Sequence, residues 1–524
     1  MKPLALTACL TLTAQARNVF VLPTNVDVTQ ATPTGIVYAG TPLGQVASST
    51  TGNDPFAVFA KPATNPAATK YYVIARSGSQ TIQILNSVFS QTGSFNFGQQ
   101  VTSAGLSPDG RRLLVFAGNL YIINTDTDTQ VATQFIDVGP NANDIAFSHD
   151  SRRAFVASQS FQRVTAVDLV TNSGAGSFGI GAATRVSVSM APNGLLYVGS
   201  DGKVFEVDPR VSIFNFNTAV RRSVDVIGTA GKLHFTPDGT RAITPNLTPS
   251  TGNTLFYFLS LDLNSPIQVS SVPTSALSST SAVFEKMLVT SNTTAYALTT
   301  PLSSPSRALY KLTLPDAPVG GSSLGTPSLE ENFFGGLGKI PIAETLSATA
   351  EAPSAAHMVI GSPLKILSSV ADNTFYQINL TNNNKTDEVK LTQQGGVVAY
   401  AGPVASLDAG DLPATVLRYN ATQPALPVST TTVANKSLPL GVRVLTASGL
   451  PIYGQSVTML PVSGGGTIDG SNTAFTNSEG FAFFTVIAPT TAGDFTFSVS
   501  FAGTSLSTSF TLSATTSGGG GGGG

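Results

Sequence analysis

The sequence predicts an all-β protein, a β-propeller of seven blades (or eight) followed by a β-sandwich. A phrase with a turn of the Pro-Asp-Gly type between short apolar strands occurs four times. Its turn residues Asp109, Asp150, Asn193 and Asp238 follow one another at intervals of 41, 43 and 45 residues. Such a period, with four strand-like runs per unit, is typical of propeller blades. After residue 428 apolar and polar residues alternate, which is typical of a β-sandwich.

The phrase is most regular at Ser107–Gly110 (SPDG) and the strands that follow it. In this turn Pro sets φ at the first corner, Asp accepts local backbone N–H groups, and Gly adopts the positive φ that follows. Flanking runs such as Arg153–Ser158 (RAFVAS) are too short for helices and rich in β-branched and aromatic residues. A blade cannot bury both of its faces alone, so the repeats must stack on one another around an axis.

Less regular forms of the phrase extend the ring on both sides. Turns near residues 65, 292 and 354 add three blades to the four regular ones. Three strands remain, and we expect them either to meet and close the ring or to form an eighth blade: Asn18–Leu22, Gly35–Gly40 and Gly396–Ala401. A propeller without its closing strand has an exposed sheet edge, so a chain cut at residue 390 is expected to aggregate.

The phrase resembles the YVTN-type β-propeller repeat, a relative of the NHL and lactonase-type propellers. The resemblance is strongest over residues 99–245, although the family's eponymous strand motif is altered. The matching segments are Ser107–Gly110, Leu120–Asn124 and Ile136–Gly139, and the altered strand reads Phe155–Ser158 and Tyr197–Ser200. This resemblance implies a fold more firmly than an activity.

The C-terminal segment resembles the bacterial Ig-like domains of invasin and intimin. The matches are Ala447–Gly454, Thr476–Ala482 and Ala492–Phe495, while the first acidic residue of the motif is missing near Thr446–Ser448. The resemblance implies a spacer or adhesive module without chemistry of its own. We expect residues 426–517 to fold alone around a core of Val444, Val457, Phe483, Val486, Phe497 and Phe501.

The N-terminus has the pattern of an export signal. Met1-Lys2 is a short positive region, Leu4–Leu12 is apolar, and Ala14–Ala16 fits a cleavage site. Cys9 lies in a lipoprotein-like box, so a lipid anchor is the alternative to ordinary cleavage. The predicted domains are a signal peptide at 1–16, the propeller at 17–422, a linker at 423–428, the Ig-like sandwich at 429–515 and a Gly-rich tail at 516–524. Because the glycine run ends abruptly, we also expect that a further module could follow.

Charge is sparse, with 11% charged residues and a net charge of −2. Electrostatic binding to nucleic acid or to an anionic membrane needs a basic patch, which this composition argues against. After the signal, no run reaches the ~18 apolar residues that a membrane helix needs. We therefore expect a secreted or cell-envelope protein whose partner is an extracellular protein or glycan.

One turn has the spacing of a calcium loop. Asn124, Asp126 and Asp128 alternate as oxygen-bearing residues at the start of such a loop. The Gly that the loop needs is absent, and the twelfth position is Phe135 rather than Glu. A solvated turn between the third and fourth strands of a blade is therefore favoured, with a calcium site as the weak alternative.

The histidines and the remaining acidic pair give no metal-binding pattern. His149, His234 and His357 belong to three different blades, and nothing in their spacing makes them converge. Asp408 and Asp411 are interpreted as solvated turn residues, as the 124–128 turn is. We expect no stoichiometric binding of a transition metal and no cofactor.

No catalytic residue is predicted. The chain has no G-x-S-x-G elbow, no position that matches a lactonase catalytic residue, and no Trp to serve as the indole platform of quinone-dependent propeller dehydrogenases. Three pairs of arginines follow one another along the chain and could form an anion-binding ring. Solvated charge at the surface is the simpler interpretation of these pairs, Arg111-Arg112, Arg152-Arg153 and Arg221-Arg222. The prediction is a non-catalytic binding or adhesion scaffold. The alternative is a propeller enzyme of lactonase or quinoprotein type with a site in the central channel.

Overall fold

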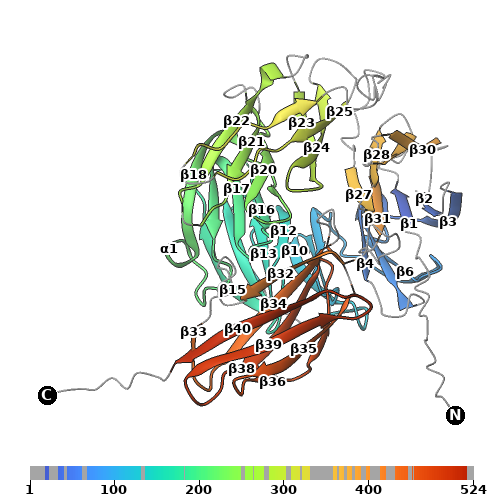
Figure 1. The fold of residues 1–524 in the computed structure, drawn as a ribbon. Helices are drawn as coiled ribbons and strands as arrows, with labels where there is room; N and C mark the ends of the chain where they lie inside the picture. Colours follow the sequence, from blue (N-terminus) through green and yellow to red (C-terminus); the bar gives the residue numbers. More distant parts are fainter. Residues whose placement is uncertain are drawn as a thin grey trace, which may run out of the picture.

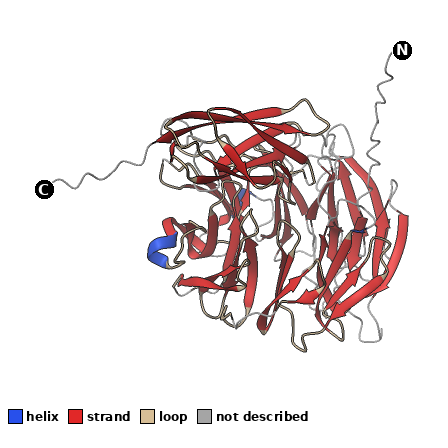
Figure 2. Ribbon diagram, turned by 90° about the horizontal axis from the view of Figure 1, so that it is seen from below, coloured by secondary structure: helices blue, strands red, loops and turns tan. Residues whose placement is uncertain are grey.

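The chain is almost entirely β-structure where it is described (Figure 2). The computed structural model describes residues 18–22, 34–39, 44–61, 68–131, 136–181, 183, 185–248, 254–263, 265–276, 282–301, 308–318, 322–330, 358–362, 365–370, 374–379, 384–390, 397–401, 413–420, 431–445, 451–452 and 454–515. Within these ranges the helical elements are α1 (Phe216–Ala219) and the 3-10 turn η2 (Thr274–Ala276). Neither is long enough to cross a membrane. Several predictions fall outside the described residues: the signal peptide at 1–16 with Cys9, the linker at 423–428, the tail at 516–524, and His357, Asp408 and Asp411.

Eight small antiparallel sheets precede residue 402 in the described part of the chain, and we number them around the ring. Sheet 1 contains β31 (Val397–Ala401), β1 (Asn18–Leu22), β2 (Thr34–Ala39) and β3 (Gly44–Thr50). Sheet 2 contains β4 (Asn53–Lys61), β5 (Lys70–Ser77), β6 (Ile82–Leu85) and β7 (Gln91–Phe95). Sheet 3 contains β8 (Ser103–Leu106), β9 (Arg112–Ala117), β10 (Asn119–Asn124) and β11 (Thr129–Gln130). Sheet 4 contains β12 (Ala142–Phe147), β13 (Arg153–Ser158), β14 (Arg163–Asp168) and β15 (Ser173–Gly179).

The next four sheets continue the same order. Sheet 5 contains β16 (Val186–Met190), β17 (Leu196–Val207) and β18 (Val220–Thr229), and β17 pairs with β16 through its first half and with β18 through its second. Sheet 6 contains β19 (His234–Phe235), β20 (Arg241–Pro245), β21 (Thr254–Ser260) and β22 (Gln268–Pro273). Sheet 7 contains β23 (Ala282–Val289), β24 (Thr294–Pro301), β25 (Ala308–Thr313) and β26 (Ser328–Glu330). Sheet 8 contains β27 (Met358–Ser362), β28 (Lys365–Val370), β29 (Thr374–Asn379) and β30 (Asn384–Lys390).

The sheets follow one another around a ring. Each sheet from 2 to 8 contacts the next, and β31 of sheet 1 contacts both β27 and β4. First strands of neighbouring sheets, such as β8, β12 and β16, lie against one another. They therefore lie nearest the centre of the ring. This arrangement confirms the prediction of an all-β, β-propeller-like chain.

Apolar layers between neighbouring sheets form the core of the ring. The middle strands are buried on both faces: β13 is buried at five of its six positions and β21 at all seven. Phe155 packs in the layer between sheets 4 and 5, and Tyr197 in the layer between sheets 5 and 6. Burial on both faces explains why these strands are nearly continuous apolar runs rather than alternating ones.

Sheet 1 joins the two ends of the ring-forming segment. β31 pairs antiparallel with β1, with Phe20 opposite Ala399. β2 and the unpredicted β3 complete four strands. The expectation that the leftover strands meet is confirmed, and they form a full sheet of their own. The described residues thus contain eight sheets before residue 402. The sequence predicts seven blades, with eight as the alternative.

Two further sheets pack face to face beside the ring, drawn in brown to red in Figure 1. Sheet 9 contains β32 (Thr415–Asn420), β34 (Ser437–Leu445), β38 (Phe481–Ile487) and β36 (Thr467–Asp469). Sheet 10 contains β33 (Thr431–Val433), β40 (Ser507–Thr515), β39 (Gly493–Phe501), β35 (Ser456–Ser463) and β37 (Thr473–Phe475). β32 pairs with β34 although it precedes the predicted linker at 423–428. A fragment that starts at residue 426 therefore lacks an edge strand of sheet 9.

The core between these two sheets matches the expected set at five of six positions. Val444, Val457, Val486, Phe497 and Phe501 are buried in it. Phe483 is half-buried on the outer face of β38, where its ring lies over Gly441, and Phe484 occupies the core instead. The expectation for Phe483 was wrong because the run FAFF offers aromatic rings to both faces of the strand, so composition alone does not give its register.

Substituting Phe483 and Phe484 one at a time tests which of the two rings lies in the core. Phe484→Ala empties a position in the closed core and should lower the free energy of unfolding by about 3–5 kcal/mol. Phe483→Ala removes a half-exposed ring and should cost clearly less. Urea unfolding followed by circular dichroism measures both variants. Equal losses would contradict the observed register.

Candidate functional site

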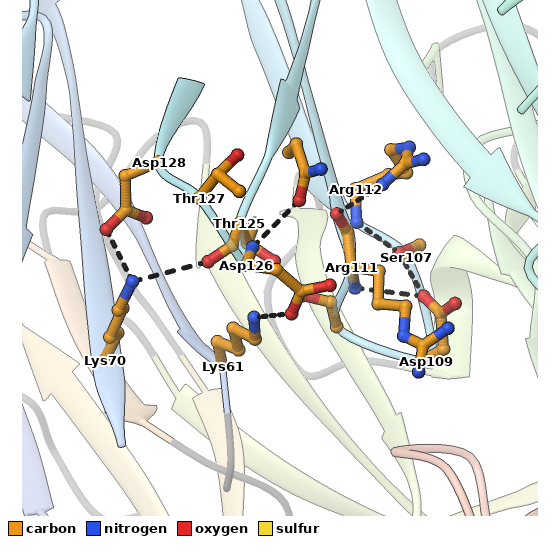
Figure 3. A network of polar contacts seen from close by, with 12 residues as sticks. Lys61, Lys70, Ser107, Asp109, Arg111, Arg112, Thr125, Asp126, Thr127 and Asp128 are labelled. Carbon is orange, nitrogen blue, oxygen red and sulfur yellow. Dashed lines mark hydrogen bonds and ion pairs between the residues drawn. The ribbon is translucent and has the colours of Figure 1, made fainter. Parts of the chain in front are cut away.

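The turn proposed as a weak calcium site faces the neighbouring sheet 2 (Figure 3). Asp126 forms an ion pair with Lys61. Asp128 accepts from Lys70 Nζ at 2.5 Å through one oxygen, and from the hydroxyl of Tyr72 at 2.6 Å through the other. Asn124 Oδ1 accepts the backbone N–H of Asp126 at 2.9 Å. The oxygen atoms that a calcium ion would need thus already bind cations and donors of this chain.

Thr125 fixes this turn from inside. Its hydroxyl is buried and donates to the carbonyl of Gly110 at 2.5 Å, while its own carbonyl accepts from the Tyr72 hydroxyl at 3.2 Å. Burial, together with the hydrogen bond to Asp128, raises the pKa of Tyr72 far above its ordinary value. Tyr72 therefore stays a neutral donor that holds sheets 2 and 3 together.

Equivalent contacts connect other neighbouring sheets. Arg153, at the start of β13, donates to the carbonyls of Pro209 and Val211 in sheet 5, both at 2.7 Å. Arg241, at the start of β20, donates to the carbonyl of Pro315, which follows β25 of sheet 7. In each case a cation of one sheet binds the turn that precedes the last strand of the next sheet, after β17 in sheet 5 and after β25 in sheet 7. Arg153 and Arg241 thus bind backbone carbonyls of this chain, and Arg241 Nη2 also lies 3.4 Å from Asp238 Oδ2. The 124–128 turn takes part in the same kind of contact between sheets.

The ion pair of Asp126 predicts a pH-dependent contribution to stability. The hydrogen bond from Lys61 holds the pKa of the Asp126 carboxyl below its ordinary value. A carboxyl with a lowered folded-state pKa stabilises the fold above about pH 4, and this contribution is lost as the pH falls through the folded-state value. Asp126→Asn should therefore lower the free energy of unfolding by less than about 1 kcal/mol at neutral pH, because the Asp126 side chain is 52% exposed and solvent screens the pair. In strong acid the substitution should change nothing. Urea unfolding between pH 7 and pH 2 tests this, and a loss that does not vary with pH would contradict it.

Short hydrogen bonds within each repeated turn stabilise its conformation. The hydroxyl of Ser107 donates to Asp109 Oδ1 at 2.6 Å, and that oxygen also accepts the N–H of Arg111 at 3.0 Å. Ser148 and Asp150 repeat the first of these contacts at 2.6 Å. The sequence S-x-D is therefore explained by local hydrogen bonding.

The turn of sheet 4 departs from this pattern at two positions. His149 stands where the other three turns have Pro, and Ser151 stands where they have Gly. Ser151 has a φ of 58°, which favours glycine, and its hydroxyl accepts the N–H of Asp109 at 3.0 Å. Ser151 thus connects the turn of sheet 4 to that of sheet 3.

His149 connects the ring to the C-terminal sheets. Its Nδ1 lies 2.5 Å from Glu479 Oε2, its Nε2 lies 2.7 Å from the carbonyl of Ala191, and its ring stacks on Phe481 with centroids 4.2 Å apart. His149 is therefore not an ordinary turn residue. His234 lies half-buried on β19, and within the described ranges no three His, Cys, Asp or Glu side chains lie close enough to hold a metal ion.

Three further hydrogen bonds reach the ring from the sandwich. The N–H of Ser478 donates to the carbonyl of Pro108 at 3.1 Å, and Asn477 Nδ2 donates to the carbonyl of His149 at 2.7 Å. Arg443 Nη1 donates to the carbonyl of Pro237 at 3.1 Å. We call residues 477–479 the docking turn, and Pro108, His149, Ala191 and Pro237 the turn face. The sequence analysis missed this contact, although His149 in place of Pro marks it.

Comparisons with known proteins give only distant similarities. No protein-family model and no curated protein sequence matches the chain. Apo AztD from Citrobacter koseri is 10% identical over 73% of this chain and 97% of its own, with a TM-score of 0.44. A functionally unknown protein from Desulfotomaculum acetoxidans is 14% identical over 64% and 96%, with a TM-score of 0.39. Hydrazine synthase from Kuenenia stuttgartiensis is 15% identical over 50% and 78%, with a TM-score of 0.36. At these values the comparisons assign neither a family nor an activity to the chain.

Proposed function

We propose that this protein is a secreted or cell-surface scaffold that binds an extracellular protein or glycan and does not catalyse a reaction. In this proposal the eight small sheets are the blades of one YVTN-type propeller. Sheets 9 and 10 are an Ig-like sandwich that begins before Thr415 and serves as a stalk or second contact. The ligand would be bound by loops at one end of a rigid ring.

Among the described residues, the sandwich covers one end of the ring and leaves the other end uncovered by it, and this observation carries the proposal. Successive turns of an antiparallel sheet lie at opposite ends of its strands. The docking turn, together with Arg443 of β34, binds the turns between first and second strands. The turns between second and third strands, such as the one that joins β13 to β14, therefore lie at the other end, which is the end we propose for the ligand.

One part of this opposite end has the side chains that a ligand surface uses. Phe161 is 48% exposed, and the Arg163 guanidinium lies 4.7 Å from its ring centroid. Beside it Asn141 Nδ2 donates to the hydroxyl of Ser160 at 2.8 Å. An exposed aromatic ring among amide, hydroxyl and guanidinium groups suits contact with a sugar or a peptide.

The non-catalytic part of the proposal rests on how the charged groups are used. Lys61 and Lys70 bind the acidic turn of sheet 3, and Arg153 binds carbonyls of sheet 5. These groups contribute to the stability of the ring rather than to a site where charge would change during a reaction. We therefore expect no hydrolysis of lactones by the purified protein and no oxidation of alcohols after addition of a quinone cofactor.

A binding array of glycans and extracellular-matrix proteins tests the function. The full chain should bind at least one component, and Phe161→Ala should weaken that binding. Phe475→Ala is the matched control, because Phe475 is 56% exposed on the sandwich. Binding lost with Phe475→Ala but kept with Phe161→Ala would place the ligand on the sandwich instead, and lactone turnover would replace the scaffold with the enzymatic alternative.

A further inference from the structure

The turn face offers a row of equivalent backbone acceptors. Pro108, His149 and Pro237 occupy the same position of the repeated turn, and each of their carbonyls accepts a hydrogen bond from the sandwich. The turn itself closes through the carbonyl of the preceding residue, as in the bond from Gly110 N–H to Ser107 O at 2.8 Å. In these three turns the repeat therefore leaves one carbonyl available for another segment of chain.

His149 adds selectivity to this row. Its imidazole binds the Glu479 carboxylate and stacks on Phe481, which is 2% exposed and has the Arg443 guanidinium 5.2 Å from its ring centroid. A buried aromatic ring with an arginine beside it is a common centre of a specific interface. The departure from the repeat thus lies where recognition is needed.

Both partners are shaped by their own contacts. Asn477 Oδ1 accepts the N–H groups of Glu479 at 3.0 Å and Phe481 at 2.9 Å, so the docking turn is held within the sandwich. The turn of sheet 4 is held by Ser148 and Asp150. Neither surface needs the other in order to form, and preorganised surfaces lose little entropy on binding.

We propose that the turn face is a recognition site for the docking turn, and that it binds the sandwich of a second copy of this chain when the contact within one chain is prevented. Tethering in one chain gives an effective concentration of roughly millimolar, so the intramolecular contact dominates in the native protein. Two copies can join by exchanging sandwiches, with the same contacts formed between chains. This inference does not depend on the proposed external ligand.

Two complementary full-chain variants test the proposal. His149→Pro restores the residue found in the other three turns, so the ring should fold, but it removes the contacts to Glu479 and Phe481. Asn477→Asp with Glu479→Ala keeps an oxygen for the N–H groups of Glu479 and Phe481, but removes the donor to His149 and the carboxylate. The first variant weakens the turn face and keeps an intact docking turn, and the second weakens the docking turn and keeps an intact turn face, so only a mixture can pair the two intact surfaces.

Sedimentation velocity gives the outcome. Each variant alone should be monomeric, and their equimolar mixture should form a one-to-one dimer. As a control, Asp469→Ala with Asn472→Asp alters exposed residues of the sandwich that form none of the contacts to the ring described above, and its mixture with His149→Pro should stay monomeric. A mixture of the complementary variants that remains monomeric overturns the proposal, and so does dimerisation of His149→Pro alone, because its turn face lacks the imidazole.

Discussion

A chain that ends at residue 396 should aggregate, whereas a chain that ends at residue 411 should remain monomeric and unfold cooperatively. Both lack the sandwich, and they differ by β31. This strand pairs with β1 over five residues and contacts β4 and β27. Without it, β1 presents an unpaired edge at the point where the ring closes, and such edges pair with other molecules.

Size-exclusion chromatography with light scattering, followed by thermal unfolding, compares the two chains. The turn face is uncovered equally in both, so a difference between them reports on ring closure and not on loss of the sandwich. If the shorter chain were monomeric and melted cooperatively, the ring would close without β31, and sheet 1 would be an addition to a seven-bladed propeller.

The parts of the fold that depend on local chemistry were predictable from the sequence. Arg153–Ser158 was expected as a strand and is β13 with the same bounds. The turn Ser107–Gly110 contains a Pro, an acceptor side chain and a Gly within four residues. The structure gives Gly110 a φ of 73°, as the turn requires. Such signals lie within one repeat, and four copies of them reinforce one another.

Contacts between distant residues were not predictable in the same way. Asp126 and Asp128 resemble a calcium loop by spacing, but their partners Lys61 and Lys70 lie 65 and 58 residues earlier in the chain. No local pattern connects these positions. β32 was likewise assigned to the ring because it precedes the Pro-bearing segment, although its partner β34 follows that segment.

Departures from the repeat carried the missing information about the candidate site. Three turns have Pro where the fourth has His149, and three have Gly where the fourth has Ser151. Each replacement makes a contact that the repeat residue cannot make, with Glu479 in one case and Asp109 in the other. A residue that differs from the other copies of a regular repeat, in a turn that keeps its conformation, is therefore a candidate contact residue.

Arg222→Met should lower the free energy of unfolding of the ring by about 3–5 kcal/mol, because it removes the partner of a buried charge. Glu206 lies on β17 opposite Arg222 of β18 and is fully buried, and its Oε2 accepts from Arg222 Nη2 and from the Tyr197 hydroxyl, both at 2.7 Å. Arg222 also donates to the carbonyls of Asp262 and Ser265 in the next sheet. Burial and the adjacent Glu206 charge raise the pKa of Tyr197, so this hydroxyl remains a donor but cannot balance the carboxylate.

A second substitution should restore part of the loss. Glu206→Gln in the Arg222→Met background removes the buried charge that has lost its main partner and keeps an oxygen that accepts from Tyr197, so the double variant should be more stable than Arg222→Met alone. Arg221→Met is the control, because the Arg221 side chain is 41% exposed and its Nε lies 3.8 Å from Glu206 Oε1; it should cost less than about 1 kcal/mol. Urea unfolding followed by circular dichroism suits a chain without Trp. A double variant no more stable than Arg222→Met would show that the lost carbonyl contacts to sheet 6, and not the buried charge, determine the effect.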